Sequence, residues 1–185
     1  MFDRQGKRKY LTDSERLAFF KSVSSETDEN LRCFALTLFN TGCRISEALN
    51  TTSRQIDLTS KEIVFETLKQ RKRGSFRAVP LPEEVISVLC RLTAGKSAST
   101  KVWEFSRSTG YRFIKATMAS ANIRGVMASP KGLRHGFAVA CLENGVPLTT
   151  VKKWLGHARL ETTAIYLDVS GQEERKLAER VWFRD

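Results

Sequence analysis

Apolar residues recur at three- and four-residue spacing through most of this chain, and that spacing predicts a mainly helical protein. The clearest case is the range 28–40, whose expected buried face is formed by Leu31, Phe34, Ala35 and Leu38. Gly42 follows the last apolar position, and glycine often ends a helix because it tolerates a left-handed backbone. We therefore predict a helix over 28–40 that stops at Gly42.

The chain before this helix carries its own start signal. Thr12 and Glu15 have the spacing of a capping box, in which each side chain satisfies the other residue's backbone N–H. The helix that follows is expected to turn Leu17, Phe20 and Val23 toward the core.

Further helices are predicted by the same spacing, with Pro130 suited to the first turn of one and Gly145 to its end. In the range 108–121, Tyr111, Ile114 and Met118 are expected to face inward. The remaining ranges are 45–50, 83–92, 130–144, 149–155, 162–169 and 172–181.

Residues 56–81 have a different pattern. Short apolar runs with β-branched and aromatic residues flank the basic, glycine-containing stretch LKQRKRGS, which indicates strands joined by a turn. The predicted fold is therefore α+β, mainly helical, with one small antiparallel sheet of three strands. We see no linker or internal repeat, so residues 12–185 are interpreted as one domain after a basic arm over 1–11.

Composition narrows the class of partner. The chain has 185 residues, is 41% hydrophobic and carries a net charge of +11. This charge favours a polyanion, with a solvated basic surface as the alternative reading, and its spread over several segments favours nucleic acid over a membrane surface. We find no apolar run of about 18 residues and no signal peptide, which predicts a cytoplasmic protein without a membrane partner.

The cysteines do not suggest a metal site or a disulfide framework. Their spacing includes no C-x-x-C pair, so we expect reduced and mostly buried thiols. The four positions are Cys33, Cys43, Cys90 and Cys141.

Two separated stretches carry polar residues that suit a phosphate site. In TGCRISEAL, Arg44 follows the glycine stop and Glu47 lies one helical turn later, where it can orient the guanidinium. A surface salt bridge is the alternative. In KRGSFRAVPL, Lys72 lies at a turn or strand end from which a lysine can reach a ligand, although a solvated charge run would look the same.

Two later stretches add further candidates. In SPKGLRHGFAVACL, Lys131 and Arg134 are three residues apart and share a helix face, while His135 is expected to point elsewhere in a supporting, hydrogen-bonding role. In LGHARLETTAIY, His157 follows a glycine at a helix break, and Tyr166 lies nine residues further on. Alone, each would more often be a structural residue.

Together these residues suit a metal-free attack on a phosphodiester. Arginine forks bind nonbridging oxygens bidentately and stay charged at working pH. A lysine can protonate the leaving oxygen, and a tyrosine hydroxyl with an ordinary pKa near 10 needs help to lose its proton. The sequence contains no acidic metal cluster, and we predict neither metal nor cofactor.

The four stretches, in this order, resemble the tyrosine recombinase (phage integrase) family. TGCRISEAL is similar to its first-arginine box, KRGSFRAVPL to its lysine segment, SPKGLRHGFA to its H-x-L-R-H box and LGHARLETTAIY to its tyrosine box. The resemblance implies the tyrosine recombinase catalytic-domain fold. It also implies a catalytic set, with Tyr166 as nucleophile, of Arg44, Lys72, Lys131, Arg134, His157 and Tyr166.

Two departures from the family pattern stand out. Lys131 occupies the place of a histidine, which leaves the general base open among His157, water and Lys131 with a lowered pKa. Only 43 residues precede Arg44, whereas most members carry a helical core-binding domain there. We therefore expect no such domain, and either a catalytic domain alone or a short member similar to the fimbrial phase-switch invertases.

The resemblance implies site-specific DNA recombination through a 3′-phosphotyrosine link, with Lys72, or less plausibly Lys69, protonating the 5′-oxygen. Expected partners are duplex DNA at a specific site, further copies of the chain in a tetrameric synapse, and an accessory DNA-bending protein. The alternatives are a DNA-binding regulator with the same fold and a type IB topoisomerase. Expected DNA-contacting residues are Lys7, Arg8, Lys9, Lys69, Arg71, Arg73, Lys152 and Lys153.

Overall fold

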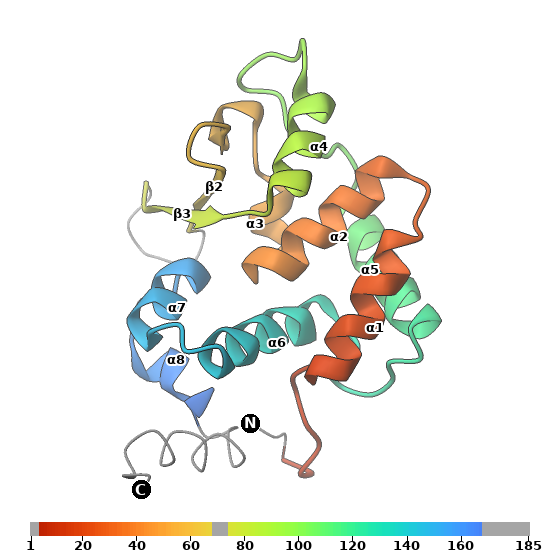
Figure 1. Ribbon diagram of the computed structural model, residues 1–185, viewed down its shortest axis with the longest axis vertical. Helices are drawn as coiled ribbons and strands as arrows, with labels where there is room; N and C mark the ends of the chain where they lie inside the picture. The colour runs from red at the N-terminus through yellow and green to blue at the C-terminus, as the bar shows by residue number, and fades with distance from the viewer. Residues whose placement is uncertain (1–3, 68–73, 168–185) are drawn as a thin grey trace, which may run out of the picture.

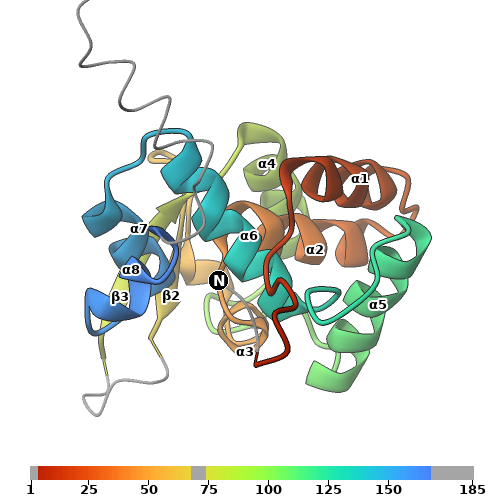
Figure 2. The same cartoon turned by 90° about the horizontal axis from the view of Figure 1, so that it is seen from below.

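The computed structural model describes residues 4–67 and 74–167 as a mainly helical fold with one three-stranded sheet. Helices α2 and α6 form the centre, with α1 and α5 at one end and the sheet, α7 and α8 at the other (Figures 1 and 2). The helices are α1 (Asp13–Ser24), α2 (Glu29–Thr41), α3 (Ile45–Leu49), α4 (Glu83–Thr93), α5 (Arg107–Ser120), α6 (Pro130–Glu143), α7 (Leu148–Leu155) and α8 (Glu161–Ala164), with a short 3-10 turn η1 (Ser53–Gln55). The α+β prediction is confirmed.

The sheet has the order β1-β2-β3 and is antiparallel throughout. Its strands are β1 (Ile56–Asp57), β2 (Glu62–Glu66) and β3 (Phe76–Pro80). Ile63, Phe65 and Val79 are buried on one face, as the period-two alternation of a half-buried sheet requires. The basic turn between β2 and β3, over residues 68–73, lies outside the described residues.

Local sequence signals set several helix ends. Thr12 and Glu15 form the predicted capping box, with Thr12 N donating to Glu15 Oε2 over 2.8 Å. Gly42 ends α2 in the left-handed region at φ 59°, and an added Cβ would lie 2.5 Å from Phe137 Cδ1. Glycine is therefore required at Gly42 both for its backbone conformation and for close packing against α6.

The inward face predicted for α1 was wrong for Leu17 and Phe20 and is confirmed for Val23. Leu17 and Phe20 are 53% and 41% exposed, whereas Phe19 and Val23 are fully buried. Phe19 stacks on Phe39 of α2 with ring centroids 5.9 Å apart. The buried side of α1 is therefore set by an i, i+4 pair rather than by the i, i+3 series.

Two further expectations need correction. Tyr111 is 41% exposed instead of facing the core, although Ile114 and Met118 of the same helix are buried. Helix α8 ends at Ala164, so Tyr166 follows the helix rather than lying within it. The predicted helix over 172–181 lies outside the described residues.

The expectation of free, mostly buried thiols is confirmed. The four cysteines are free; Cys33 and Cys43 are buried and Cys90 and Cys141 partly so. Burial raises the pKa of Cys33 and Cys43 to about 12, which makes both thiols poor nucleophiles. Among the described helices, none is long and apolar enough to cross a membrane.

Candidate active site

A cavity of about 710 Å³ lies where α3, α5, α6 and the segment after α7 meet. Its lining brings together residues predicted from three separate stretches of the sequence: Arg44, Lys131, Arg134, His157 and Tyr166. His135 and Tyr111 line it too. The cavity is therefore strongly basic and contains a tyrosine.

Arg44 is the N-cap residue of α3, directly after the turn made by Gly42. Its Nη1 donates to Glu47 Oε1 over 2.7 Å, and its backbone N–H donates to Glu47 Oε2 over 2.8 Å. The Glu47 side chain is fully buried, while that of Arg44 is 27% exposed. Glu47 thus orients the guanidinium from behind, as predicted, and leaves part of it facing the cavity.

Arg134 is held by the ends of two helices. Its Nη1 donates to the carbonyl of Gly42 over 2.8 Å, and its Nη2 donates to the carbonyl of Leu155 over 2.7 Å. These carbonyls lie at the C-terminal ends of α2 and α7, where the helix dipole favours a cation. Burial and then the neighbouring Arg44 lower the pKa of Arg134 to about 10, so the group stays charged at neutral pH.

His157 follows Gly156, which ends α7 in the left-handed region at φ 65°. Its Nδ1 lies 2.8 Å from Thr163 Oγ1, which fixes the ring. Burial first, and then Arg134 and Arg44, lower the pKa of His157 to about 4. The imidazole is therefore neutral at pH 7.

Tyr166 is only 2% exposed, and its hydroxyl lies 2.9 Å from Nδ1 of His135. We expected His135 to point away from the site, and this was wrong. Tyr166 folds back over α6, so its hydroxyl reaches His135, the residue that follows Arg134 on that helix. Burial raises the pKa of Tyr166, and Arg134 and Arg44 offset part of that effect. Burial and then Lys131 lower the pKa of His135 to about 3.

Lys131 lies in the first turn of α6 and shares the cavity lining with Arg134, as the three-residue spacing predicted. Lys9 lines a small hollow next to it, together with Lys131 and His135. The N-terminal segment thus approaches the site. Arg8 of that segment is engaged within the chain, since its Nη1 and Nη2 donate to Glu15 over 2.6 and 2.7 Å.

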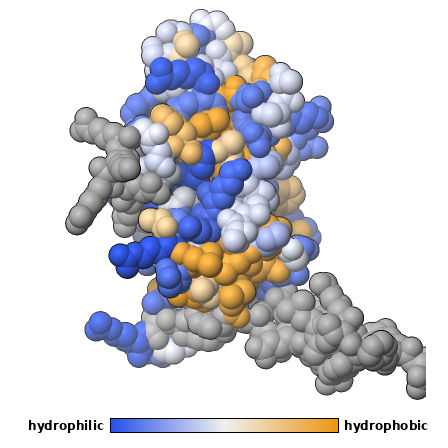
Figure 3. All heavy atoms as spheres, turned by 90° about the vertical axis from the view of Figure 1, so that its left-hand side faces the viewer, coloured by the Kyte–Doolittle hydropathy of each residue, from blue (hydrophilic) through white to orange (hydrophobic). Residues whose placement is uncertain are grey.

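The structure does not test the prediction that Lys72 is the general acid. Lys69, Arg71, Lys72 and Arg73 lie outside the described residues. Lys152 and Lys153 are in the last turn of α7 and line a second hollow, of about 350 Å³, which His157 also borders. Figure 3 views the molecule from the side of α7 and the sheet, and hydrophilic side chains spread over much of that face.

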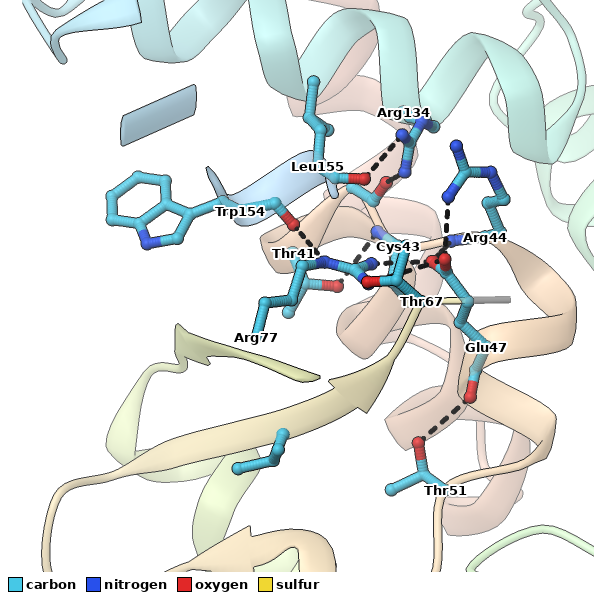
Figure 4. Close-up of polar contacts among 12 residues, drawn as sticks. Thr41, Cys43, Arg44, Glu47, Thr51, Thr67, Arg77, Arg134, Trp154 and Leu155 are labelled. Atoms are coloured by element: carbon cyan, nitrogen blue, oxygen red, sulfur yellow. Dashed lines mark hydrogen bonds and ion pairs between the residues drawn. The ribbon is translucent and has the colours of Figure 1, made fainter. Parts of the chain in front are cut away.

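Arg77 lies beside the site and was not predicted from the sequence. This residue is 6% exposed in β3, and Figure 4 shows its guanidinium between α7 and Glu47. Its Nη2 donates to Glu47 Oε2 over 2.6 Å and its Nε to the carbonyl of Trp154 over 2.7 Å. The available signal was an arginine at an inward position of a strand, where a charged side chain needs a partner.

Comparisons with known proteins show that the fold is that of tyrosine recombinase catalytic domains. The family model described as "Phage integrase family" matches residues 9–173. A tyrosine recombinase of Thermosipho africanus is 31% identical over 170 residues, which cover 89% of this chain and 59% of that protein. The tyrosine recombinase XerA of Pyrococcus furiosus is 30% identical over 182 residues, covering 93% and 61% respectively.

Solved structures agree. A crystal structure of XerA recombinase has a TM-score of 0.77 at 25% identity, covering 95% of this chain and 66% of that one. The catalytic domain of bacteriophage HP1 integrase has a TM-score of 0.67 at 23% identity, covering 90% and 92%, and shows the same fold. The chain belongs to the phage integrase family, and it spans about three-fifths of the length of the curated relatives it matches.

Proposed function

We propose that this protein is a site-specific DNA recombinase that cleaves and rejoins DNA through a 3′-phosphotyrosine link at Tyr166. Residues 12–185 would form its catalytic domain. The observation that carries the proposal is the convergence of Arg44, Arg134 and His157 on one cavity beside a tyrosine hydroxyl. Family membership and relatives named tyrosine recombinases support it.

The charge of the cavity suits a phosphodiester. Arg44 keeps part of its guanidinium exposed, and Arg134 stays protonated because its pKa of about 10 lies well above neutrality. Both can donate to the nonbridging oxygens, on which negative charge grows in the transition state. Lys131 adds a further cation, and neutral His157 can hydrogen bond to the same phosphate through Nε2, because Nδ1 contacts Thr163.

In the proposed reaction the Tyr166 oxygen bonds to phosphorus while the bond to the 5′-oxygen breaks. The tyrosine proton passes to water, to His157 in the tautomer with an unprotonated Nε2, or to Lys131 in its neutral form, and Lys72 protonates the leaving 5′-oxygen. A 5′-hydroxyl of a partner strand reverses these steps. The phosphotyrosine conserves bond energy, so the reaction we propose consumes no ATP and has no step that requires a metal ion.

Tyr166 must move before it can attack. Its hydroxyl is buried and bonded to His135, which is a resting arrangement. We propose that binding to a specific DNA site, with further copies of the chain in a tetrameric synapse, releases it. One solved relative, XerH, is described as bound to its difH substrate. An accessory DNA-bending protein and action on the cytoplasmic nucleoid belong to the same proposal.

The test is covalent capture. The probe is a pool of nicked duplexes with randomised arms, whose nick lets the short 5′-hydroxyl strand leave after cleavage and traps the adduct. Metal is omitted. Wild-type protein should form an adduct whose recovered sequences share a site, and Tyr166→Phe should form none. Absence of any wild-type adduct overturns the proposal.

Two further outcomes point to the alternatives. A shared site bound without an adduct would indicate a DNA-binding regulator with the recombinase fold. Relaxation of supercoiled plasmid regardless of sequence would indicate a type IB topoisomerase. Either result contradicts site-specific recombination by this chain.

A further inference from the structure

Arg77 occupies a buried position between the two halves of the site. Its Nη1 donates to Thr67 Oγ1 over 3.1 Å in addition to the bonds to Glu47 and to Trp154. Its guanidinium also lies 5.2 Å from the ring centroid of Phe65. With the side chain only 4% exposed, Arg77 is not placed to contact DNA.

The carboxylate of Glu47 accepts hydrogen bonds from two arginines, Arg77 and Arg44. Arg77 Nη2 lies 2.6 Å from Oε2 and Nη1 lies 3.4 Å from Oε1, while Arg44 Nη1 lies 2.7 Å from Oε1. Burial acts to raise the pKa of Glu47, but Arg77, and then Arg44, keep it below its usual value. Arg77 thus supplies most of the compensation for a buried carboxylate.

This compensation affects Arg44. A fully buried carboxylate needs its charge compensated, and loss of one cationic partner leaves that compensation to the cation that remains. Because Arg77 shares the charge of Glu47, Arg44 keeps donors for the cavity. Without Arg77, Arg44 would be the one remaining arginine bonded to Glu47.

Arg77 also supports the other wall of the cavity. Gly156, at the end of α7, packs directly against it, since an added Cβ on Gly156 would lie 2.9 Å from Arg77 Nη1. The carbonyl of Trp154 that Arg77 holds is adjacent to the carbonyl of Leu155 that receives Arg134. One side chain therefore connects both arginines of the site (Figure 4).

We propose that Arg77 is a positioning residue, which holds Glu47 and the end of α7 so that Arg44 and Arg134 face the scissile phosphate. This inference rests on the proposed recombinase function for its reaction, but not for its geometry. Loss of an outer partner that orients a metal ligand typically costs 10–100-fold in activity, and we expect a loss of the same order for a partner that orients Arg44. Arg77→Met should lower the cleavage rate by about that factor and change DNA affinity little.

The first measurement compares two substrates of the captured sequence, one with a phosphodiester and one with a methylphosphonate at the scissile position. The methylphosphonate removes a nonbridging charge. If the loss of Arg77 acts through Arg44, the ratio of the wild-type cleavage rate to the Arg77→Met rate should fall toward 1 on this substrate. An equal defect on both substrates would mean a merely structural role and would overturn the proposal.

The second measurement is a double-mutant cycle. Glu47→Gln combined with Arg77→Met removes the buried carboxylate that Arg77 compensates, so the double variant should cleave no more slowly than the worse single variant. Multiplication of the two single losses would contradict coupling. Arg77→Lys keeps the charge but lacks the fork, and it should recover part of the rate.

Arg16 gives a matched control. It too is largely buried against an aromatic ring, 4.3 Å from the centroid of Phe39, but it belongs to α1 and is absent from the cavity lining. Arg16→Met should lower thermal stability and show equal rates, relative to wild type, on the two substrates. If Arg16→Met also lost more activity on the phosphodiester than on the methylphosphonate, the effect would not be specific to Arg77. That result would overturn its assignment as a positioning residue.

A DNA-free measurement separates this proposal from the proposed function. Sulfate, a tetrahedral dianion, is titrated while the Arg44 Nε–Hε signal is followed by NMR. Arg77→Met should bind sulfate about tenfold more weakly than wild type, in line with the expected loss in cleavage. Equal sulfate affinities of wild type and Arg77→Met would overturn the role of Arg77. If the affinities differ but wild-type protein does not cleave DNA, only the recombinase function is overturned.

Discussion

At the scale of single residues, the burial of His135 among basic groups makes stability depend on pH. The pKa of His135 is lowered to about 3 and that of His157 to about 4, against ~6.5 for an ordinary histidine. The unfolded chain therefore binds more protons between these values, and stability falls as pH is lowered from ~6.5 toward 4. Lys131, Arg134 and Lys9 also face His135 and act in the same direction.

The expected result is a melting temperature that falls over this window in wild-type protein and falls less in His135→Gln, which keeps polar bonding to Tyr166 but does not titrate. The difference should correspond to roughly 1–3 kcal/mol at pH 4. Melting curves followed by circular dichroism from pH 7 to 4 give the comparison. The carboxylates Glu15 and Glu47 are present in both proteins, so parallel decreases would show that His135 does not contribute.

Residue types and spacings predicted Arg44, Glu47, Arg134 and Tyr166 as neighbours, because each lies in a stretch with an unusual polar composition. They did not predict Arg77 or the direction of His135. The role of Arg77 depends on the hydrogen bonds that it donates to Glu47, thirty residues away, which no local pattern encodes. His135 depends on how the segment after α8 returns to α6.

At the scale of elements, the first turn of α6 carries part of the cavity and is packed against its own entry loop. An added Cβ on Gly132 would lie 1.8 Å from the carbonyl oxygen of Met127. Alanine usually stabilises a helix interior relative to glycine, but here the backbone has to shift. Gly132→Ala should therefore lower the free energy of unfolding by about 1–3 kcal/mol and displace Lys131, which reduces cleavage.

Gly110 of α5 provides the comparison, because its added Cβ would meet ring carbons of Phe34 at 3.0 Å, and a ring can adjust by a few tenths of an ångström. Thermal melts and adduct formation of both variants test the ranking. The packing argument would be contradicted if Gly110→Ala lowered the melting temperature as much as Gly132→Ala. It would also be contradicted if Gly132→Ala melted at the wild-type temperature.

Helix ends were more predictable than helix faces. The capping box at Thr12 and the glycine stop at Gly42 are encoded by residues adjacent to each end, and both are present. The face of α1 depends instead on which ring of α2 it meets, and Phe19 takes that place. The end of α8 at Ala164 likewise follows from where Tyr166 has to pack.

At the scale of the whole molecule, four stretches distant in sequence meet because α2 and α6 pack centrally and α7 ends beside both. Arg134 joins these helices because it donates hydrogen bonds to the carbonyls of Gly42 and Leu155, at the ends of α2 and α7. Composition indicated a polyanion partner from a net charge of +11, but charge alone could not locate its face. We expect that face to include Lys152 and Lys153, which line a hollow that His157 also borders.

This placement predicts the salt dependence of DNA binding. Each lysine that neutralises a phosphate contributes about 0.9 to the slope of log affinity against log salt, because counterions are released. Replacing both Lys152 and Lys153 with glutamine should lower the slope by about 1.8 and weaken binding similarly for all sequences. Fluorescence anisotropy with labelled duplex over a series of salt concentrations measures it. Lys96→Gln, in the exposed loop after α4, should leave the slope unchanged. If the α7 variant kept the wild-type slope, DNA would have to approach the cavity from a side that does not include α7.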